Sequence, residues 1–363
     1  MALQVGLVGL PNVGKSTLFN AVTQASAEVA NFPFCTIEPN IGVVAVPDPR
    51  LTRIAELAGS ARTVPTGFEV VDIAGLVAGA SHGEGLGNRF LARIREVDAV
   101  CHVVRCFEDP DVAHLPGAID PAHDIEVVVT ELALKDLDTV ERSLERAQRA
   151  AKGGDRDLRR EAEQLAALRD HLAAGEVART FAGELDPALS RELSLITAKP
   201  VLYAANVAED DLPDGNEHVA VVSKRAEHED AEVVVTCAEV EAQLTELPTE
   251  ERAEYLAALG LQRSSLERLI DRAYRLLGLI TFFTTVSNET RAWTVPAGAT
   301  APRAAREIHT DMERGFIRAE VVSFEDYAAL GGEAGAREAG RLRVEGKDYV
   351  VKDGDVIHFR FNV

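Results

Sequence analysis

Aromatic residues are scarce in this chain of 363 residues and make up only 5% of it. Hydrophobic residues still account for 46%, so we expect a sizeable core built mostly from Ala, Leu and Val. The four cysteines are few and scattered, and their lack of C-x-x-C spacing excludes a typical zinc site or disulfide framework. They are Cys35, Cys101, Cys106 and Cys237. This cysteine usage favours a reducing cytosol.

Positive charge is also in short supply, because 38 basic residues face 59 acidic ones and the net charge is -21. This balance argues against wholesale coating of nucleic acid and leads us to expect no DNA partner, although a local RNA-binding surface stays possible. The first residues run straight into a strand-like segment without a basic region, and long apolar runs are lacking. We therefore expect no signal peptide, no membrane partner and a cytoplasmic location.

What is present near the amino terminus is a phosphate-binding loop. Residues 9–16 read GLPNVGKS and fit G-x-x-x-x-G-K-[ST]. An apolar strand-like run precedes the loop and a helical segment follows it, which a chance glycine turn would not show. Backbone N–H groups at such a helix start form a nest for phosphate, and the lysine adds a cation. The predicted nucleotide-binding residues here are Asn12, Val13, Gly14, Lys15, Ser16 and Thr17.

Two further segments lie where a nucleotide switch needs them. Thr36 sits in a Pro-punctuated loop about twenty residues after the phosphate loop, the spacing of a switch threonine that binds Mg²⁺ and senses the γ-phosphate. Asp72 ends a strand and begins D-x-x-G, so it can hold a Mg²⁺-bound water while the Gly75 N–H contacts the γ-phosphate. We predict Ser16 and Thr36 as the metal ligands. Leu76 follows Gly75 and cannot orient a water as glutamine does.

Long motifs along the chain resemble the YchF / Obg-like ATPase family, a branch of the translation-factor P-loop GTPases. They read GLPNVGKST, NFPFCTIEPN, DIAGL, GEGLGN, NVAE, RAWTVPAGATAP and KDGDV. The resemblance implies a cytosolic, ribosome-associated nucleotide hydrolase that accepts ATP, often in preference to GTP. It also implies a hydrophobic residue in place of the glutamine, as Leu76 is here, and a catalytic role for the loop histidine that matches His114.

His114 is our candidate catalytic residue, because an imidazole can position a water or relay a proton near neutral pH. Phosphoryl transfer depends mainly on positioning and charge stabilisation, so a base is not obligatory. An exposed loop histidine without a catalytic role is the alternative, and His82 is a rival candidate.

The base-reading residues follow two later strands. Asn206-Val207-Ala208-Glu209 stands where GTPases carry N-K-x-D, and the longer acid Glu209 pairs poorly with guanine. An asparagine amide can instead satisfy adenine N6 and N7. Cys237-Ala238 aligns with the loop whose backbone contacts the base. We therefore predict that ATP binds at least as well as GTP, with a relaxed site that accepts either base as the alternative.

Strands that alternate with helices predict an α/β fold whose nucleotide-binding domain has a mostly parallel sheet. We expect an OBG-type G domain in two parts, a helical insertion between them and a C-terminal α+β, ubiquitin-like domain that resembles a TGS domain. Their expected ranges are 1–124 and 198–278 for the G domain, 125–197 for the insertion and 279–363 for the last domain. Residues 250–277 read as one helical stretch.

Apolar residues at three- and four-residue spacing predict two helices in the insertion, joined at 152–155. We expect an antiparallel hairpin that projects as an arm about 40 Å long, with a helical layer packed on the core as the alternative. The segment 279–363 carries 11 basic and 13 acidic residues, so it is nearly neutral although the whole chain has a net charge of -21. We expect this segment and the arm to contact ribosomal RNA or protein, with evenly solvated charges as the alternative.

The leading hypothesis is a Mg²⁺-dependent ATPase, with slow intrinsic turnover, that switches its affinity for the ribosome. The alternatives are a GTP-specific GTPase of ribosome assembly and a nucleotide-gated binding protein with negligible turnover.

Overall fold

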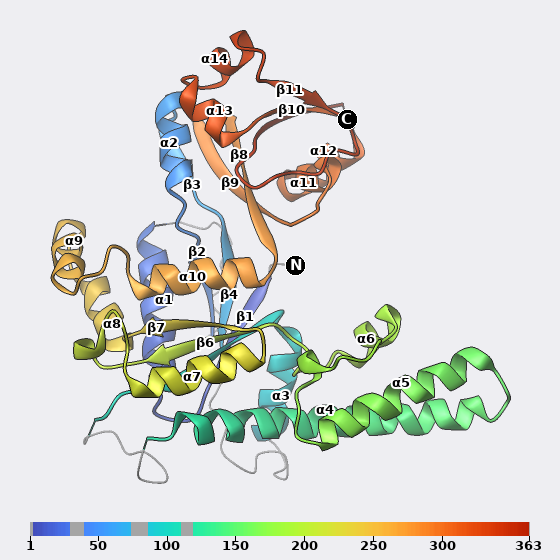
Figure 1. The fold of residues 1–363 in the computed structure, drawn as a ribbon. Coiled ribbons are helices and arrows are strands. Elements are labelled where there is room, and N and C mark those ends of the chain that lie inside the picture. Colours follow the sequence, from blue (N-terminus) through green and yellow to red (C-terminus); the bar gives the residue numbers. More distant parts are fainter. Residues whose placement is uncertain (1–2, 30–39, 74–85, 110–118, 363) are drawn as a thin grey trace. The chain divides into compact units, whose positions relative to one another are not determined.

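The computed structural model describes residues 3–29, 40–73, 86–109 and 119–362. The chain divides into two compact units, each made of segments that are separate in the sequence (Figure 1). The first unit comprises 1–22, 37–42 and 69–269. The second comprises 23–36, 43–68 and 270–363.

The described part of the first unit is built on a sheet with the strand order β2-β4-β1-β5-β6-β7. The strands are β1 (Gln4–Val8), β2 (Ile41–Ala45), β4 (Gly67–Asp72), β5 (Ala99–Arg105), β6 (Val201–Asn206) and β7 (Glu232–Thr236). Strand β1 pairs in parallel with β4 and β5, β5 with β6, and β6 with β7. Parallel pairing brings the carboxyl ends of these strands to one edge, where α/β folds bind their ligands.

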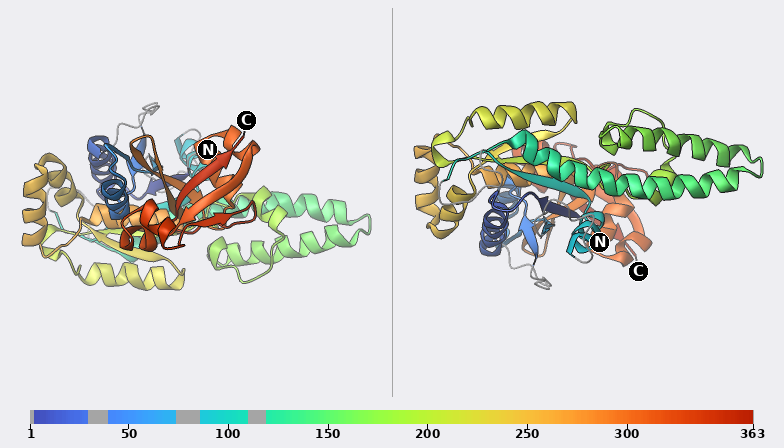
Figure 2. Two further views of the ribbon diagram at one scale, coloured as in Figure 1. Left: turned by 90° about the horizontal axis from the view of Figure 1, so that it is seen from above. Right: turned by 90° about the horizontal axis from the view of Figure 1, so that it is seen from below.

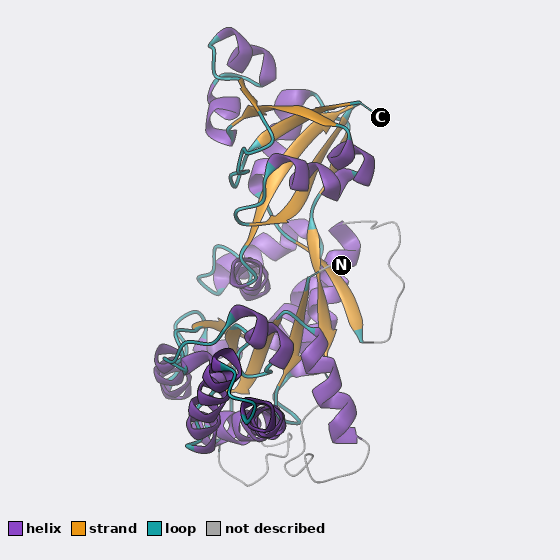
Figure 3. Ribbon diagram, turned by 90° about the vertical axis from the view of Figure 1, so that its right-hand side faces the viewer, coloured by secondary structure: helices purple, strands orange, loops and turns teal. Residues whose placement is uncertain are grey.

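Helices lie on both sides of this sheet (Figure 3). The described helices of this part of the chain, including those of the hairpin insertion, are α1 (Lys15–Val29), α3 (Leu86–Glu96), α4 (Pro121–Ala151), α5 (Arg156–Ala173), α6 (Pro187–Leu193), α7 (Glu217–His228), α8 (Ala238–Glu246), α9 (Thr249–Ala258) and α10 (Ser265–Leu276). Alternate strand residues such as Val8, Val100 and Tyr203 form one buried core with α3, α4 and α7. This alternation follows from the two-residue period of a strand.

Helix α4 serves two purposes along its 31 residues. Its first half packs on the sheet through Ile125, Val128 and Leu132. Its second half packs against α5, and the two run side by side as a hairpin (Figure 2). The first half of α4 therefore forms the layer on the core that was the alternative prediction, and the second half forms part of the predicted arm.

The seam of the hairpin uses the predicted apolar residues. Its buried members are Val140, Leu144, Ala147, Leu165, Leu168 and Leu172. Leucines from the segment around α6 complete this small core. The three- and four-residue spacing also includes Leu134, which is instead 45% exposed between the part of α4 that packs on the sheet and the part that packs against α5.

The sheet of the second unit has the described strand order β11-β10-β12-β8-β9-β3. Its strands are β3 (Arg62–Val64), β8 (Leu279–Val286), β9 (Glu289–Pro296), β10 (Phe316–Val322), β11 (Arg343–Glu345) and β12 (Val356–Phe361). The helices are α2 (Pro49–Ala58), α11 (Ala301–Ile308), α12 (Thr310–Arg314), α13 (Phe324–Ala329) and α14 (Glu333–Glu338). One core joins the sheet to α11 and α12, and another joins it to α2, α13 and α14.

The expected fold class is confirmed: an α/β domain with a mostly parallel sheet, a helical insertion and a C-terminal α+β domain. The helical stretch expected at 250–277 is instead two helices, α9 and α10. Gly260 lies between them at φ +71°, a conformation that ends a helix. Among the described residues, no helix has the length and apolar character needed to cross a membrane.

Candidate nucleotide-binding site

The loop between β1 and α1 has the backbone that a phosphate cradle requires. Gly9, Asn12 and Gly14 all have positive φ, at +158°, +63° and +90°. A Cβ on Gly9 would lie 2.5 Å from the Val103 carbonyl oxygen, and one on Gly14 would collide with the side-chain amide of Asn206. Because both positions are closed to larger residues, the glycines let this loop pack directly against β5 and β6.

Three of the predicted phosphate and metal residues lie together at the start of α1. The Lys15 ammonium forms an ion pair with Asp72 at the end of β4. The Ser16 hydroxyl lies 3.5 Å from the other carboxylate oxygen of Asp72. Lys15 is only 7% exposed, so its cation is held in place and partly desolvated. A fixed cation beside a helix start attracts phosphate strongly.

A cavity of about 720 Å³ extends from this loop across the carboxyl edge of the sheet. Its volume lies within the range of about 300–1,000 Å³ that suits small-molecule ligands. Eight predicted residues line it: Asn12, Gly14, Thr17, Asn206, Val207, Glu209, Cys237 and Ala238. The phosphate end and the base end of the predicted site thus share one space.

Asn206 ties the two ends of this cavity together. Its Nδ2 donates to the Val13 carbonyl at 2.9 Å, and its Oδ1 accepts from the Ala238 N–H at 2.9 Å. The side chain is buried, and both heavy atoms of its amide are engaged within the protein. Contact between Asn206 and adenine stays a prediction, while the structure shows it as a bridge between the phosphate loop and the start of α8.

Glu209 follows β6 on the exposed rim of the cavity and has a partner that the sequence did not indicate. The Tyr255 hydroxyl of α9 lies 3.2 Å from Glu209 Oε1 and 2.9 Å from Gln243 Oε1. Gln243 lines the cavity as well. Nothing in the sequence pattern around Tyr255, a partly buried residue of an amphipathic helix, indicates that its hydroxyl would donate to Glu209.

The loop after β5 forms another wall that sequence reasoning missed. Phe107, Glu108 and Asp109 line the cavity. The buried Arg105 guanidinium stacks 4.6 Å from the Phe107 ring and donates to the carbonyls of Phe107 and Asp109 at 3.2 and 3.3 Å. Arg105 therefore fixes the course of this loop by charge-assisted hydrogen bonds.

Cys237 precedes α8 and is buried as a free thiol, like Cys101 and Cys106. Burial raises the pKa of the Cys237 thiol, so it stays protonated and inert at neutral pH. Its backbone position, next to Ala238, is what places it at the cavity.

Several predicted residues lie outside the described part of the chain. They are Thr36, Gly75 and His114, together with Leu76 and the rival His82. Their predicted roles stay predictions.

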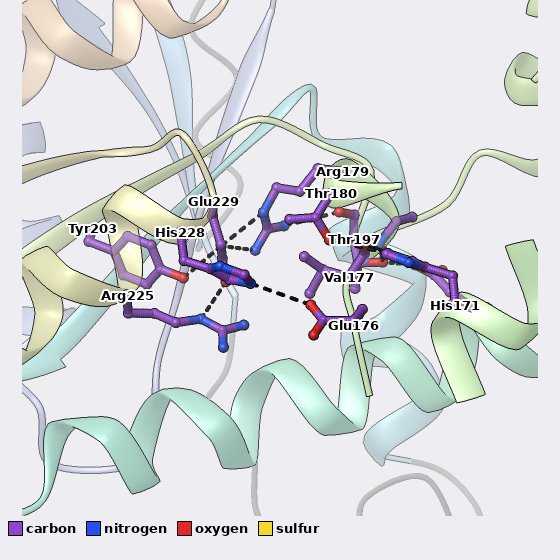
Figure 4. A network of polar contacts seen from close by, with 12 residues as sticks. His171, Glu176, Val177, Arg179, Thr180, Thr197, Tyr203, Arg225, His228 and Glu229 are labelled. Atoms are coloured by element: carbon purple, nitrogen blue, oxygen red, sulfur yellow. Dashed lines mark hydrogen bonds and ion pairs between the residues drawn. The ribbon is translucent and has the colours of Figure 1, made fainter. Parts of the chain in front are cut away.

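A buried polar network joins the base of the arm to the sheet of the first unit (Figure 4). The Glu229 carboxylate, at the end of α7, is completely buried and pairs with Arg179 and Arg225. It also accepts from the Tyr203 hydroxyl at 3.0 Å. Burial by itself would raise the pKa of Glu229, but the two guanidinium groups lower it below its usual value. Arg179 belongs to the segment that follows the arm, so this network anchors the arm.

Comparisons with known proteins agree with the geometry. Residues 4–142 match the family MMR_HSR1, described as a 50S ribosome-binding GTPase, and residues 279–362 match YchF-GTPase_C, described as a protein of unknown function (DUF933). The chain is 54% identical over 366 residues to a protein of Bacillus subtilis named ribosome-binding ATPase YchF, and both chains are covered completely. The protein of that name from Escherichia coli O157:H7 is 55% identical over 364 residues, again with both chains fully covered.

Solved structures support the same assignment. The structure of the Schizosaccharomyces pombe YchF GTPase superposes with a TM-score of 0.89 at 35% identity, covering 99% of this chain and 98% of that one. A GTP binding protein from Pyrococcus horikoshii OT3 shares the fold, with a TM-score of 0.61 at 19% identity and coverage of 99% and 100%. The resemblance drawn from the motifs is thus confirmed, and the chain belongs to the YchF family.

Proposed function

We propose that this protein is a cytoplasmic, Mg²⁺-dependent ATPase that binds the ribosome according to its nucleotide state. The observation that carries the proposal is a continuous cavity of about 720 Å³ that runs from Asn12, Gly14 and Thr17 of the phosphate loop to Asn206, Val207 and Glu209. A purine nucleoside triphosphate has a phosphate tail for the first end and a base for the second. The relatives named ribosome-binding ATPase YchF support the same reading.

The phosphates would be held by the backbone N–H groups of the loop and by Lys15. When phosphate binds there, the Lys15 ammonium would interact with both Asp72 and the phosphate. Such positioning and charge stabilisation supply most of the catalysis in phosphoryl transfer. Gly75 would add a backbone contact to the γ-phosphate.

The residues beside the loop suit Mg²⁺. Magnesium is usually held by one or two protein oxygens together with phosphates and waters. The Ser16 hydroxyl and an Asp72 carboxylate oxygen lie 3.5 Å apart and offer two hard oxygen donors at this place. Ser16 and Thr36 would bind the ion directly, and Asp72 would order its water. The ion would neutralise the charge that builds up on the phosphates.

We propose slow intrinsic hydrolysis with His114 as the residue that positions the attacking water. Leu76 has no hydrogen-bonding group to do so. An enzyme that lacks this glutamine relies on a partner or on another side chain for faster turnover. Stimulation of turnover by ribosomes would separate this enzyme from a binding protein that barely hydrolyses.

A surface of the second unit fits a phosphate-bearing partner such as ribosomal RNA. Arg318 and Arg360 of the sheet and Arg337 of α14 surround Glu320, with Arg360 making two hydrogen bonds to it at 3.2 and 3.1 Å. Arg337 also pairs with Glu333 at 2.8 Å, so three exposed guanidinium groups face two carboxylates and one positive charge is left over for phosphate. We propose this surface and the arm as the ribosome contacts, with domain limits at 1–124, 125–197, 198–278 and 279–363.

Isothermal titration with ATP, GTP and their diphosphates, each with Mg²⁺, tests the nucleotide site. We expect ATP to bind at least as tightly as GTP and Lys15→Met to weaken both at least tenfold, because a charged hydrogen bond contributes about 1.5–3 kcal/mol. Lys152→Met, at the tip of the arm, is the matched control and should bind normally. A hundredfold preference for GTP would favour the GTP-specific alternative, and no binding of any purine triphosphate would exclude the proposal.

Cosedimentation with ribosomes at several salt concentrations tests the partner. Arg318→Ala with Arg337→Ala leaves the Arg360–Glu320 pair intact, and we expect weaker binding and a shallower salt dependence. Arg53→Ala with Arg263→Ala removes two exposed arginines elsewhere and serves as the control. Equal cosedimentation of both double variants would show that the surface around Glu320 is not a contact.

A further inference from the structure

The base end of the cavity contains a carboxylate, Glu209, one oxygen of which is already engaged by a tyrosine hydroxyl. A carboxylate that recognises guanine accepts from two neighbouring donors, N1–H and the 2-amino group. Adenine presents a single donor at that edge, its 6-amino group, beside an acceptor nitrogen. The number of carboxylate oxygens left available therefore decides which base is matched.

Tyr255 donates a hydrogen bond to one oxygen of Glu209. Its hydroxyl lies 3.2 Å from Glu209 Oε1 and 2.9 Å from Gln243 Oε1. Glu209 and Gln243 line the cavity, and both offer acceptor oxygens to the same hydroxyl proton. Burial and then the Glu209 carboxylate raise the pKa of Tyr255, so the hydroxyl keeps its proton at neutral pH and stays a donor.

We propose that Tyr255 is a positioning residue that sets nucleobase specificity: its hydroxyl donates to Glu209 Oε1 and fixes the orientation of the carboxylate, so that one carboxylate oxygen is presented to the base. That oxygen accepts from the adenine 6-amino group but cannot pair with both guanine donors. The inference rests on the proposed nucleotide site and extends it. It also explains why a half-exposed tyrosine on α9 lies against an acid that is 46 residues distant in sequence.

The proposal distinguishes three triphosphates in the unaltered protein. Inosine triphosphate has the N1–H donor of guanine but lacks the 2-amino group. With one oxygen available, the 2-amino group contributes nothing, so GTP and inosine triphosphate should bind within about twofold of each other. GTP binding tenfold more tightly than inosine triphosphate would show that both oxygens are available and would overturn the proposal.

The variant Tyr255→Phe keeps the ring and removes only the hydroxyl. Release of one charged acceptor should raise GTP affinity about tenfold relative to ATP, the size of one hydrogen bond to a charged group. GTP should then also bind more tightly than inosine triphosphate. Glu254→Gln, an exposed change on the same helix, should leave all ratios unaltered.

A double-mutant cycle with Glu209→Gln shows whether Tyr255 acts through the acid. In the Glu209→Gln background, Tyr255→Phe should no longer change the ratio of ATP to GTP affinity. Equal loss of affinity for all nucleotides on Tyr255→Phe would mean a merely structural role and would refute the inference. Failure of the unaltered protein to bind any purine triphosphate would instead refute the proposed function, so the two failures are distinguishable.

Discussion

Asn206 offers a direct test of how the nucleotide site is assembled. Its amide joins Val13 in the phosphate loop to Ala238 at the start of α8, with both hydrogen bonds at 2.9 Å and the side chain only 4% exposed. The isosteric variant Asn206→Asp keeps the acceptor for the Ala238 N–H. It places a second carboxylate oxygen against the Val13 carbonyl, where a donor was, so two acceptors face each other in a buried site.

The expected destabilisation is about 2–4 kcal/mol, from one lost buried hydrogen bond and the cost of a buried unpaired acceptor. Asn206→Ala should cost a similar amount, because it leaves the Val13 carbonyl and the Ala238 N–H without this partner. If Asn206 acts mainly as a bridge, both variants loosen the phosphate loop and the base loop together. ATP and GTP affinity should then fall in parallel, by at least tenfold, with their ratio unchanged within about twofold.

Amide hydrogen exchange provides the structural readout, because local opening is visible there even when a multi-unit chain does not unfold in one step. We expect faster exchange at 9–17 and 237–246 and unchanged exchange in the second unit. The exposed Asn362→Asp serves as a matched control and should change stability by less than about 0.5 kcal/mol. A tenfold greater loss of ATP than of GTP affinity, without faster exchange, would show that Asn206 reads the base and would refute the bridge argument.

Two more predictions concern the arm anchor and its pH dependence. Glu229→Gln should destabilise the first unit by about 3 kcal/mol, the low end for a broken buried ion pair, because Arg179 and Arg225 keep some water contact. Urea unfolding measures this loss, and Glu145→Gln, in an exposed pair, should show almost none. His102 is buried in β5 beside Tyr203, a partner of Glu229. Burial lowers the pKa of His102 to about 4, so between pH 6.5 and 4 the unfolded chain binds a proton that the folded chain does not, and the free energy of unfolding should fall by about 3 kcal/mol as the pH drops. His102→Phe should remove this slope above pH 4.5, and an unchanged slope would assign it to other groups.

The sequence predicted the phosphate end of the site because that end is local. Gly9, Gly14, Lys15 and Ser16 lie within eight residues, and their types are dictated by one strand, one turn and one helix start. The hairpin of α4 and α5 was predictable for the same reason, since the three- and four-residue spacing of its leucines is a short-range pattern.

Features that depend on long-range packing left no such pattern. Helix α2 and strand β3 lie between two strands of the first sheet in sequence, yet they pack in the second unit. The burial of α2 is explained there by side chains such as Phe283 and Val356, more than 200 residues away in sequence. The contacts of Tyr255 and Arg105 were also not predictable. A tyrosine on an amphipathic helix and an arginine at a strand end are both common, so neither residue indicates its partner.

Helix α7 connects the nucleotide site to the arm within one rigid element. Asn216, which caps its first turn, donates to the Cys106 carbonyl at 2.7 Å, just before the loop that lines the cavity. Glu229 follows its last turn and forms an ion pair with Arg179, in the segment that follows the arm. A helix of 12 residues spans about 18 Å. Glu229 bonds both Tyr203 of β6 and Arg179 of the segment that follows the arm, so α7 is tied at its start to the wall of the cavity and at its end to the sheet and the base of the arm.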